Sequence, residues 1–152
     1  MKPIINWVLM ANSSYAEIFE VKAMHVTFLQ RMTFEERREK MHDIVSDKQG
    51  HNYSRMGVHG GGGHMLGSED GLRRHEESIF AHEIVEFLVK AKAEHLFNIL
   101  TFIAAPHFLG ELRNVMKLKS HHLSIDKEIH KDFPQRLSEH EKIAHIKELL
   151  DI

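Results

Sequence analysis

The sequence contains no cysteine, and almost all of its glycine is confined to one stretch. The absence of cysteine from 152 residues excludes a disulfide framework and thiolate chemistry. Eight of the nine glycines lie between Gly50 and Gly71, and glycine loses more backbone freedom on folding than any other residue. We therefore expect ordered structure on both sides of a single flexible segment.

Long apolar runs and an excess of one charge are missing too. The 20 Lys and Arg residues nearly balance the 22 Asp and Glu residues, for a net charge of −2, which argues against a strongly basic nucleic-acid binder. No stretch approaches the ~20 apolar residues of a membrane span. The opening apolar run ends at Asn12, too early for an export signal. We expect a soluble cytoplasmic protein.

What is present is the composition of one globular domain. Apolar residues make up 42% and charged residues 28% of the chain, which is typical of a folded protein with a core. The sequence has no internal repeat and no composition shift that would separate a second domain. We therefore treat residues 1–152 as a single domain.

The hydrophobic pattern predicts three strands, followed by helix, strand, helix, strand and helix. Ile4 to Met10 reads as a strand buried on both faces, and Tyr15 to Val21 as its hairpin partner. From Met24 to Phe34 apolar residues follow period two, which indicates a half-exposed strand. A capping box at Thr33–Glu36 predicts a short helix before Asp47. The later elements are helix 73–94, strand 97–104, a helix from Pro106, a strand within 121–133 and a closing helix capped by Ser138 and Glu141.

This βββαβαβα order predicts an α/β fold with a mixed five-stranded sheet. It is similar to the ribonuclease-H-like architecture, which the central domain of archaeal and eukaryotic class-1 peptide release factors resembles. The nuclease form needs carboxylates on the central strands to hold two metal ions. Strands 4–10 and 97–104 contain no acid, so they cannot complete a metal-binding cluster with the acids of the long helix: Glu76, Glu77, Glu83 and Glu86. A metal-dependent nuclease is disfavoured.

Residues 47–72 form the predicted flexible segment, with four consecutive glycines at 60–63. A run of this kind belongs to a mobile loop, or to a loop that orders only against a partner. The segment also contains several histidines, and its predicted flexibility makes it the first place to look for function.

Residue-level motifs extend over most of the chain. In order they are Trp7-Val8-Leu9-Met10-Ala11-Asn12, Ala16-Glu17-Ile18-Phe19-Glu20, Val45-Ser46-Asp47-Lys48-Gln49-Gly50, Ala105-Pro106-His107-Phe108-Leu109-Gly110 and Lys131-Asp132. Together they resemble the bacterial family described as "protein required for attachment to host cells", which is related to the release-factor central domain.

That resemblance implies a candidate site. The release-factor loop carries Gly-Gly-Gln ahead of a long helix, and here Gly62-Gly63-His64 stands in a comparable place. Histidine replaces glutamine, and the domains that read stop codons are absent, so codon-specific termination is not expected. Two functions stay open. One is a non-enzymatic or weakly active module that works through a partner such as the ribosome or tRNA, in translation or surface-attachment regulation. The other is peptidyl-tRNA hydrolysis in ribosome rescue.

Two further residue sets have alternative interpretations. Lys48, Arg55, Arg73 and Arg74 are candidate contacts for a nucleic-acid phosphate backbone, or part of an ordinary solvated face. A second set of residues suggests a metal-binding protein or simply solvated imidazoles: His51, His59, His64, His75 and His82. No HExxH motif, P-loop or nucleophile elbow is present. We predict no metal site and no cofactor.

Overall fold

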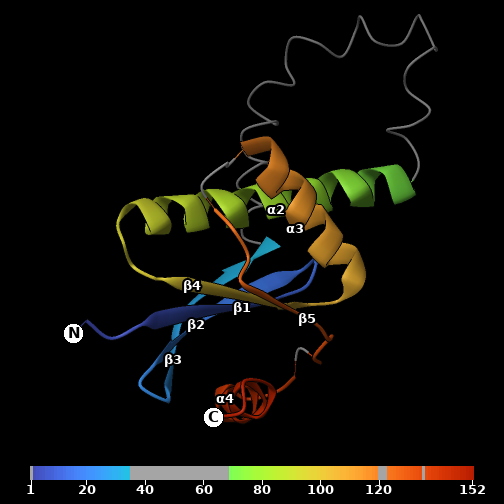
Figure 1. Ribbon diagram of the computed structural model, residues 1–152. Helices are drawn as coiled ribbons and strands as arrows, with labels where there is room; N and C mark the ends of the chain where they lie inside the picture. Colours follow the sequence, from blue (N-terminus) through green and yellow to red (C-terminus); the bar gives the residue numbers. More distant parts are fainter. Residues whose placement is uncertain (1, 35–68, 120–122, 135) are drawn as a thin grey trace, which may run out of the picture.

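The computed structural model describes residues 2–34, 69–119, 123–134 and 136–152. In these residues the elements follow the predicted mixed α/β order, with a five-stranded sheet (Figure 1). They are β1 (Ile5–Ala11), β2 (Tyr15–Lys22), β3 (His25–Thr33), α2 (Glu69–Ala93), β4 (Ile99–Ala104), α3 (Pro106–Lys119), β5 (Lys127–His130) and α4 (Glu139–Leu149). The short helix predicted before Asp47 lies outside the described residues.

The sheet is mixed, as the sequence predicts. Its strand order is β3-β2-β1-β4-β5. β2 pairs antiparallel with β1 and β3, whereas β4 pairs parallel with β1 and β5. β1, β3, β4 and β5 therefore end on the same side of the sheet. We call this side the carboxyl edge and define it by Asn12, Thr33, Ala105 and Lys131, the residues at these strand ends.

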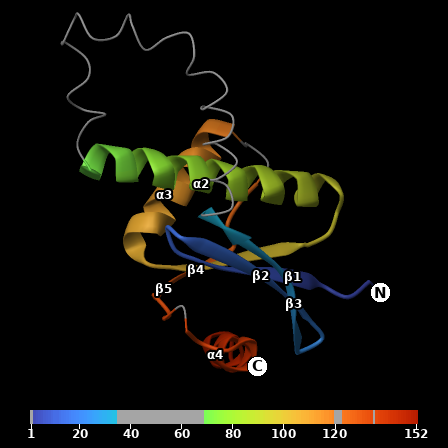
Figure 2. The ribbon, with the colours of Figure 1, turned by 180° about the vertical axis from the view of Figure 1, so that it is seen from behind.

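Helices cover both faces of the sheet. α2 and α3 lie on one face and α4 on the other, and the two opposite views agree (Figures 1 and 2). β1 shows why both faces need a cover: Trp7 and Leu9 join the core under α2 and α3, whereas Val8 and Met10 join the core over α4. The prediction of a first strand buried on both faces is confirmed.

β3 departs from the period-two pattern. Ile18 pairs with Gln30 and Phe19 with Phe28, so that Leu29 has no partner on β2 and forms a bulge. The bulge reverses the facing of the residues that follow. Val26 and Phe28 pack in the α4 core, whereas Met32 and Phe34 pack against the α2–α3 core. The strand is half-exposed, as predicted. Its period-two pattern does not hold across the bulge, because alternation does not survive an inserted residue.

The turn between β2 and β3 is made by Ala23 and Met24, although Met24 was predicted to lie in the strand. Both residues have positive φ, 49° and 69°, as the tight two-residue turns of hairpins require. Met24 is 68% exposed. Hairpin geometry thus overrides its apolar character.

α2 begins earlier than predicted. It starts at Glu69, so the last residues of the predicted flexible segment 47–72 are helical; residues 47–68 lie outside the described residues. Gly71 sits in the first turn, where part of the backbone lacks helical hydrogen bonds in any case and a glycine is tolerated. The helix ends without glycine. His95 has φ 59°, and the amides of His95 and Leu96 donate to the carbonyls of Lys92 and Ala91, a Schellman ending.

The C-terminal elements largely follow the prediction. β4 begins at Ile99, two residues after the expected start, while Phe97 packs against Trp7 with ring centres 5.0 Å apart. β5 is short, and Leu123 precedes it in the α2–α3 core. α4 has the predicted capping box of Ser138 and Glu141. No helix in the described parts of the chain is long and apolar enough to cross a membrane.

Candidate functional site

The carboxyl edge gathers segments that are far apart in the sequence. The amide of Phe34, at the end of β3, donates to the carbonyl of Ser14, and the amide of Lys131, after β5, donates to the carbonyl of Ala104 at the end of β4. Open α/β sheets commonly bind ligands beside the carboxyl ends of their strands. This edge is therefore where a site is expected.

A buried carboxylate and an exposed imidazole meet at this edge. His107 is the second residue of α3, shortly after β4, and its Nε2 lies 2.9 Å from Oε2 of Glu77 on α2. The side chain of Glu77 is 9% exposed, whereas that of His107 is 69% exposed. No hydrogen bond joins the second ring nitrogen, Nδ1, to another described residue. Nδ1 is therefore available to form a hydrogen bond with a ligand.

Aromatic packing holds the pair in place. The ring of Phe80, one turn after Glu77, lies 6.1 Å from that of Phe108, the neighbour of His107. Phe34 meets the Phe80 ring edge-on at 6.0 Å. The end of β3, the first half of α2 and the start of α3 are thus fixed against one another beneath Glu77 and His107.

Two arginines precede Glu77 on α2. Arg73 and Arg74 lie four and three residues before it, so all three lie on neighbouring positions of one helix face. Further along α2 this face packs in the core, but Arg73 and Arg74 are exposed. Neither forms an ion pair with another described residue. Two exposed arginines therefore lie one turn of α2 before Glu77, the residue that contacts His107.

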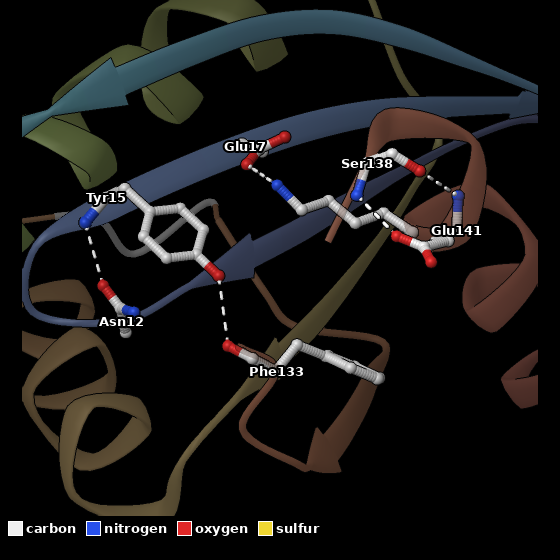
Figure 3. A network of polar contacts seen from close by, with 7 residues as sticks. Asn12, Tyr15, Glu17, Phe133, Ser138 and Glu141 are labelled. Atoms are coloured by element: carbon white, nitrogen blue, oxygen red, sulfur yellow. Dashed lines mark hydrogen bonds and ion pairs between the residues drawn. The ribbon is translucent and has the colours of Figure 1, made fainter. Parts of the chain in front are cut away.

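A second polar network lies on the face of the sheet that α4 covers (Figure 3). Lys142 of α4 forms an ion pair with Glu17 of β2, and each side chain is only 4% exposed. The hydroxyl of buried Tyr15 donates to the carbonyl of Phe133 at 3.4 Å. Arg31 and Lys142 each place their cationic group 5.4 Å from the centre of the Tyr15 ring.

The electrostatics of this network favour a structural role. Burial raises the pKa of the Tyr15 hydroxyl, the negative charges of Glu17 and Asp132 raise this pKa further, and Arg31 opposes them. The phenol is therefore a neutral donor at physiological pH. Because Tyr15, Glu17 and Lys142 are closed to solvent, the network joins α4 to the sheet and does not meet a ligand.

A third group lies on the surface between α3 and β5. The guanidinium of Arg113 donates to both carboxylate oxygens of Glu128, at 2.8 and 2.7 Å. These hydrogen bonds lower the pKa of Glu128, and His130 lowers it slightly more. A shallow hollow of about 280 Å³ lies next to the pair. Because Arg113 and Glu128 bind each other through two hydrogen bonds, neither is free to bind a ligand in this hollow.

The predicted site residues have different outcomes. Arg73 and Arg74 are exposed in the first part of α2, one turn before Glu77. The other predicted contacts lie outside the described residues: Lys48, Arg55, Gly62, Gly63 and His64. Of the histidines weighed as metal ligands, His51 and His59 also lie outside, and His75 and His82 lie seven residues apart on α2. Among the described residues, no three His, Asp or Glu side chains are grouped to hold a metal ion.

Sequence reasoning missed both buried carboxylate pairs. Glu17 and Lys142 are 125 residues apart, and Glu77 and His107 are 30 apart, so no local spacing connects them. A signal did exist for the first pair. Glu17 interrupts a strand that is otherwise apolar on that stretch, and Lys142 lies four residues before Ile146 on the apolar stripe of the last helix. A charge at an inward position calls for a buried partner.

Comparison with known proteins gives one result that bears on identity. No curated protein matches the sequence. The pattern of a family described as "Protein required for attachment to host cells" matches residues 7–145. The match runs from β1 into α4 and so includes the sheet and the helices on both of its faces. The resemblance seen in the sequence motifs is confirmed: the chain belongs to this host-attachment family.

Proposed function

We propose that this protein is a binding module, non-enzymatic or weakly active, that acts through a macromolecular partner in the cytoplasm. The observation that carries the proposal is the exposure of Arg73 and Arg74, without an ion-pair partner among the described residues, beside His107. Exposed charges of this kind add little to folding stability. Their value lies in what they can contact.

The partner we propose is the ribosome or tRNA. Guanidinium groups bind phosphate oxygens through paired hydrogen bonds, and the protein's net charge of −2 means that such binding must come from a local surface. The similarity to the release-factor central domain supports a role in translation. The family description supports a role in attachment, which a translational regulator would affect indirectly.

Co-sedimentation with ribosomes tests the proposal. We expect the protein to pellet with ribosomes at low salt and to be released as salt rises, because phosphate contacts weaken with salt. The double variant Arg73→Ala/Arg74→Ala should remain largely in the supernatant. Lys90→Ala, which removes an exposed cation from the last turn of the same helix, is the matched control and should pellet normally. A wild-type protein that never pellets, even at low salt, would refute this function.

Ribosome rescue is a second candidate function. Its support is the position of Gly62-Gly63-His64, which ends five residues before α2 begins at Glu69 and so resembles the release-factor arrangement. The assay is release of peptide from a stalled peptidyl-tRNA. Activity that disappears in Gly63→Ala, while ribosome binding persists, would favour hydrolysis over simple binding.

A further inference from the structure

The Glu77–His107 pair is poorly explained by stability. Removing a carboxylate from water is costly, and a bond to a side chain that is 69% exposed returns little, because surface ion pairs contribute about 0–1 kcal/mol. What the arrangement does provide is orientation. A carboxylate that binds one ring nitrogen fixes both the rotation of the imidazole and the role of the other nitrogen.

The imidazole is held on a rigid base. Phe80 and Phe108, the neighbours of Glu77 and His107 on their helices, stack at 6.1 Å. Phe34 and Phe80 meet edge-on at 6.0 Å. The position of the ring is thus set by three elements of the fold, as preorganised binding requires.

Arg73 and Arg74 lie one turn of α2 before Glu77, the residue that contacts this ring. Residues three and four apart on a helix have Cβ atoms about 5–6 Å apart, and Oε2 of Glu77 lies 2.9 Å from the His107 ring. Arg73 is well placed to pair with Glu77, yet no such ion pair forms. The carboxylate is used by His107, and neither arginine, both of them exposed, has an ion-pair partner among the described residues.

We propose that Arg73, Arg74 and His107 form a binding site for a phosphate group of a nucleic-acid backbone, with Glu77 as a positioning residue. The inference rests on the surface named in the proposed function and gives the chemical group that this surface recognises. Protonated His107 donates Nε2–H to Glu77 and Nδ1–H to a non-bridging phosphate oxygen, while the arginines donate to the two non-bridging oxygens.

Phosphate fits this set of donors better than the alternatives. Each of the two non-bridging oxygens of a backbone phosphate can accept more than one hydrogen bond, and the phosphate repeats along the strand, so that three cationic side chains can bind at once. A carboxylate of an acidic peptide does not repeat at this regular spacing. A membrane surface would favour exposed apolar side chains beside the cations. Among the described residues within three positions of Arg73, Arg74 or His107, Leu72 alone is a large exposed apolar residue. A nucleic-acid backbone requires only the charges.

Two measurements on the full-length protein test the site. The first follows the ring nitrogens of His107 by NMR as inorganic phosphate is added, and we expect Nδ1 to respond in the wild type and much less in Glu77→Gln. The second measures binding of a fluorescein-labelled single-stranded RNA. His107→Ala should weaken it about tenfold, as loss of a charge-assisted hydrogen bond predicts. His75→Ala is the control, because His75 is exposed on the same helix, and it should bind like the wild type.

The outcomes separate this inference from the proposed function. If the wild type and His107→Ala bind ribosomes or RNA equally well, the phosphate site is wrong and the module function stands. If phosphate moves the His107 signal but no ribosome binding occurs, the site stands and the partner is wrong. Binding to phosphatidylglycerol vesicles in place of RNA would overturn the nucleic-acid assignment. Glu77→Gln with an unchanged phosphate response would remove Glu77 from its positioning role.

Discussion

At the residue scale, two carboxylates of this protein are buried for different reasons. Glu17 meets Lys142, and both side chains are closed to solvent; Glu77 meets His107, whose ring is open. The first pair connects α4 to the sheet, and the second connects a buried helix face to the surface. Burial of Glu17 secures the fold, whereas we propose that burial of Glu77 orients His107 for binding. The two cases differ in whether the partner side chain is exposed.

The closed pair predicts a large effect of single substitutions. Lys142→Met leaves the carboxylate of Glu17 buried without its cation, and we expect a loss of about 3 kcal/mol in the free energy of unfolding. The double variant Glu17→Leu/Lys142→Met removes both charges and should recover most of that loss, because apolar replacement of a buried pair is often neutral. Urea unfolding of the single and double variants measures both values.

Lys147→Met provides the control for Lys142→Met. Lys147 is exposed on the same helix, so its substitution should change stability by less than about 0.5 kcal/mol. A cost for Lys142→Met that is as small as this control would mean that Glu17 finds another partner or water. The ion pair would then not be what secures α4.

At the element scale, the strands and helices themselves were predictable. β1 is predicted by a continuous apolar run, and α2 by an apolar stripe at helical spacing. The predicted pattern or boundary of an element fails at three places: the bulge at Leu29, the positive φ of Met24 and the helical turn that includes Gly71. The first two depend on how β2 pairs with β3. The third arises because the first turn of a helix tolerates glycine.

The capping box of α4 predicts a pH dependence. The carboxylate of Glu141 accepts from the amide of Ser138 at 2.7 Å, and this bond lowers the pKa of Glu141 below its ordinary 4.5. Because the folded pKa is depressed, the stabilisation is fully present above pH 4.5 and is lost as the pH falls through the folded pKa. Wild type should therefore be more stable than Glu141→Gln at neutral pH.

The difference between the two proteins should shrink in acid. Urea unfolding in parallel at neutral and acidic pH gives this difference directly. Ser138→Ala removes the other half of the box and should cost about 1 kcal/mol at neutral pH. A difference between wild type and Glu141→Gln that stays constant across the acidic range would show that the charge of Glu141 is not what the cap uses.

At the scale of the whole molecule, the candidate site was only partly within reach of the sequence. Arg73 and Arg74 are predicted contacts because, with Lys48 and Arg55, they flank the glycine-rich segment with positive charge. His107 and Glu77 were not, because their pairing depends on α2 and α3 crossing on one face of the sheet. The parallel order of β1, β4 and β5 brings these helices to the carboxyl edge. The candidate site therefore depends on the topology of the fold as well as on the residue types.

The two covered faces of the sheet differ in how much they bury. The core under α2 and α3 includes Trp7, Phe102 and Leu112 among many buried residues, whereas the core over α4 has far fewer. Burial of apolar surface is the main source of stability. The α4 layer is therefore the weaker of the two and should open without the rest of the fold.

Native-state hydrogen exchange tests this difference between the layers. Ile146 in α4 and Leu88 in α2 are matched probes, since both side chains are fully buried within helices. We expect the amide of Ile146 to exchange through an opening of lower free energy and weaker urea dependence than that of Leu88, because undocking α4 exposes less surface than global unfolding. Equal free energies at the two amides would mean that the sheet and all its helices unfold as one unit, and that the buried Glu17–Lys142 pair binds α4 as firmly as apolar packing holds α2.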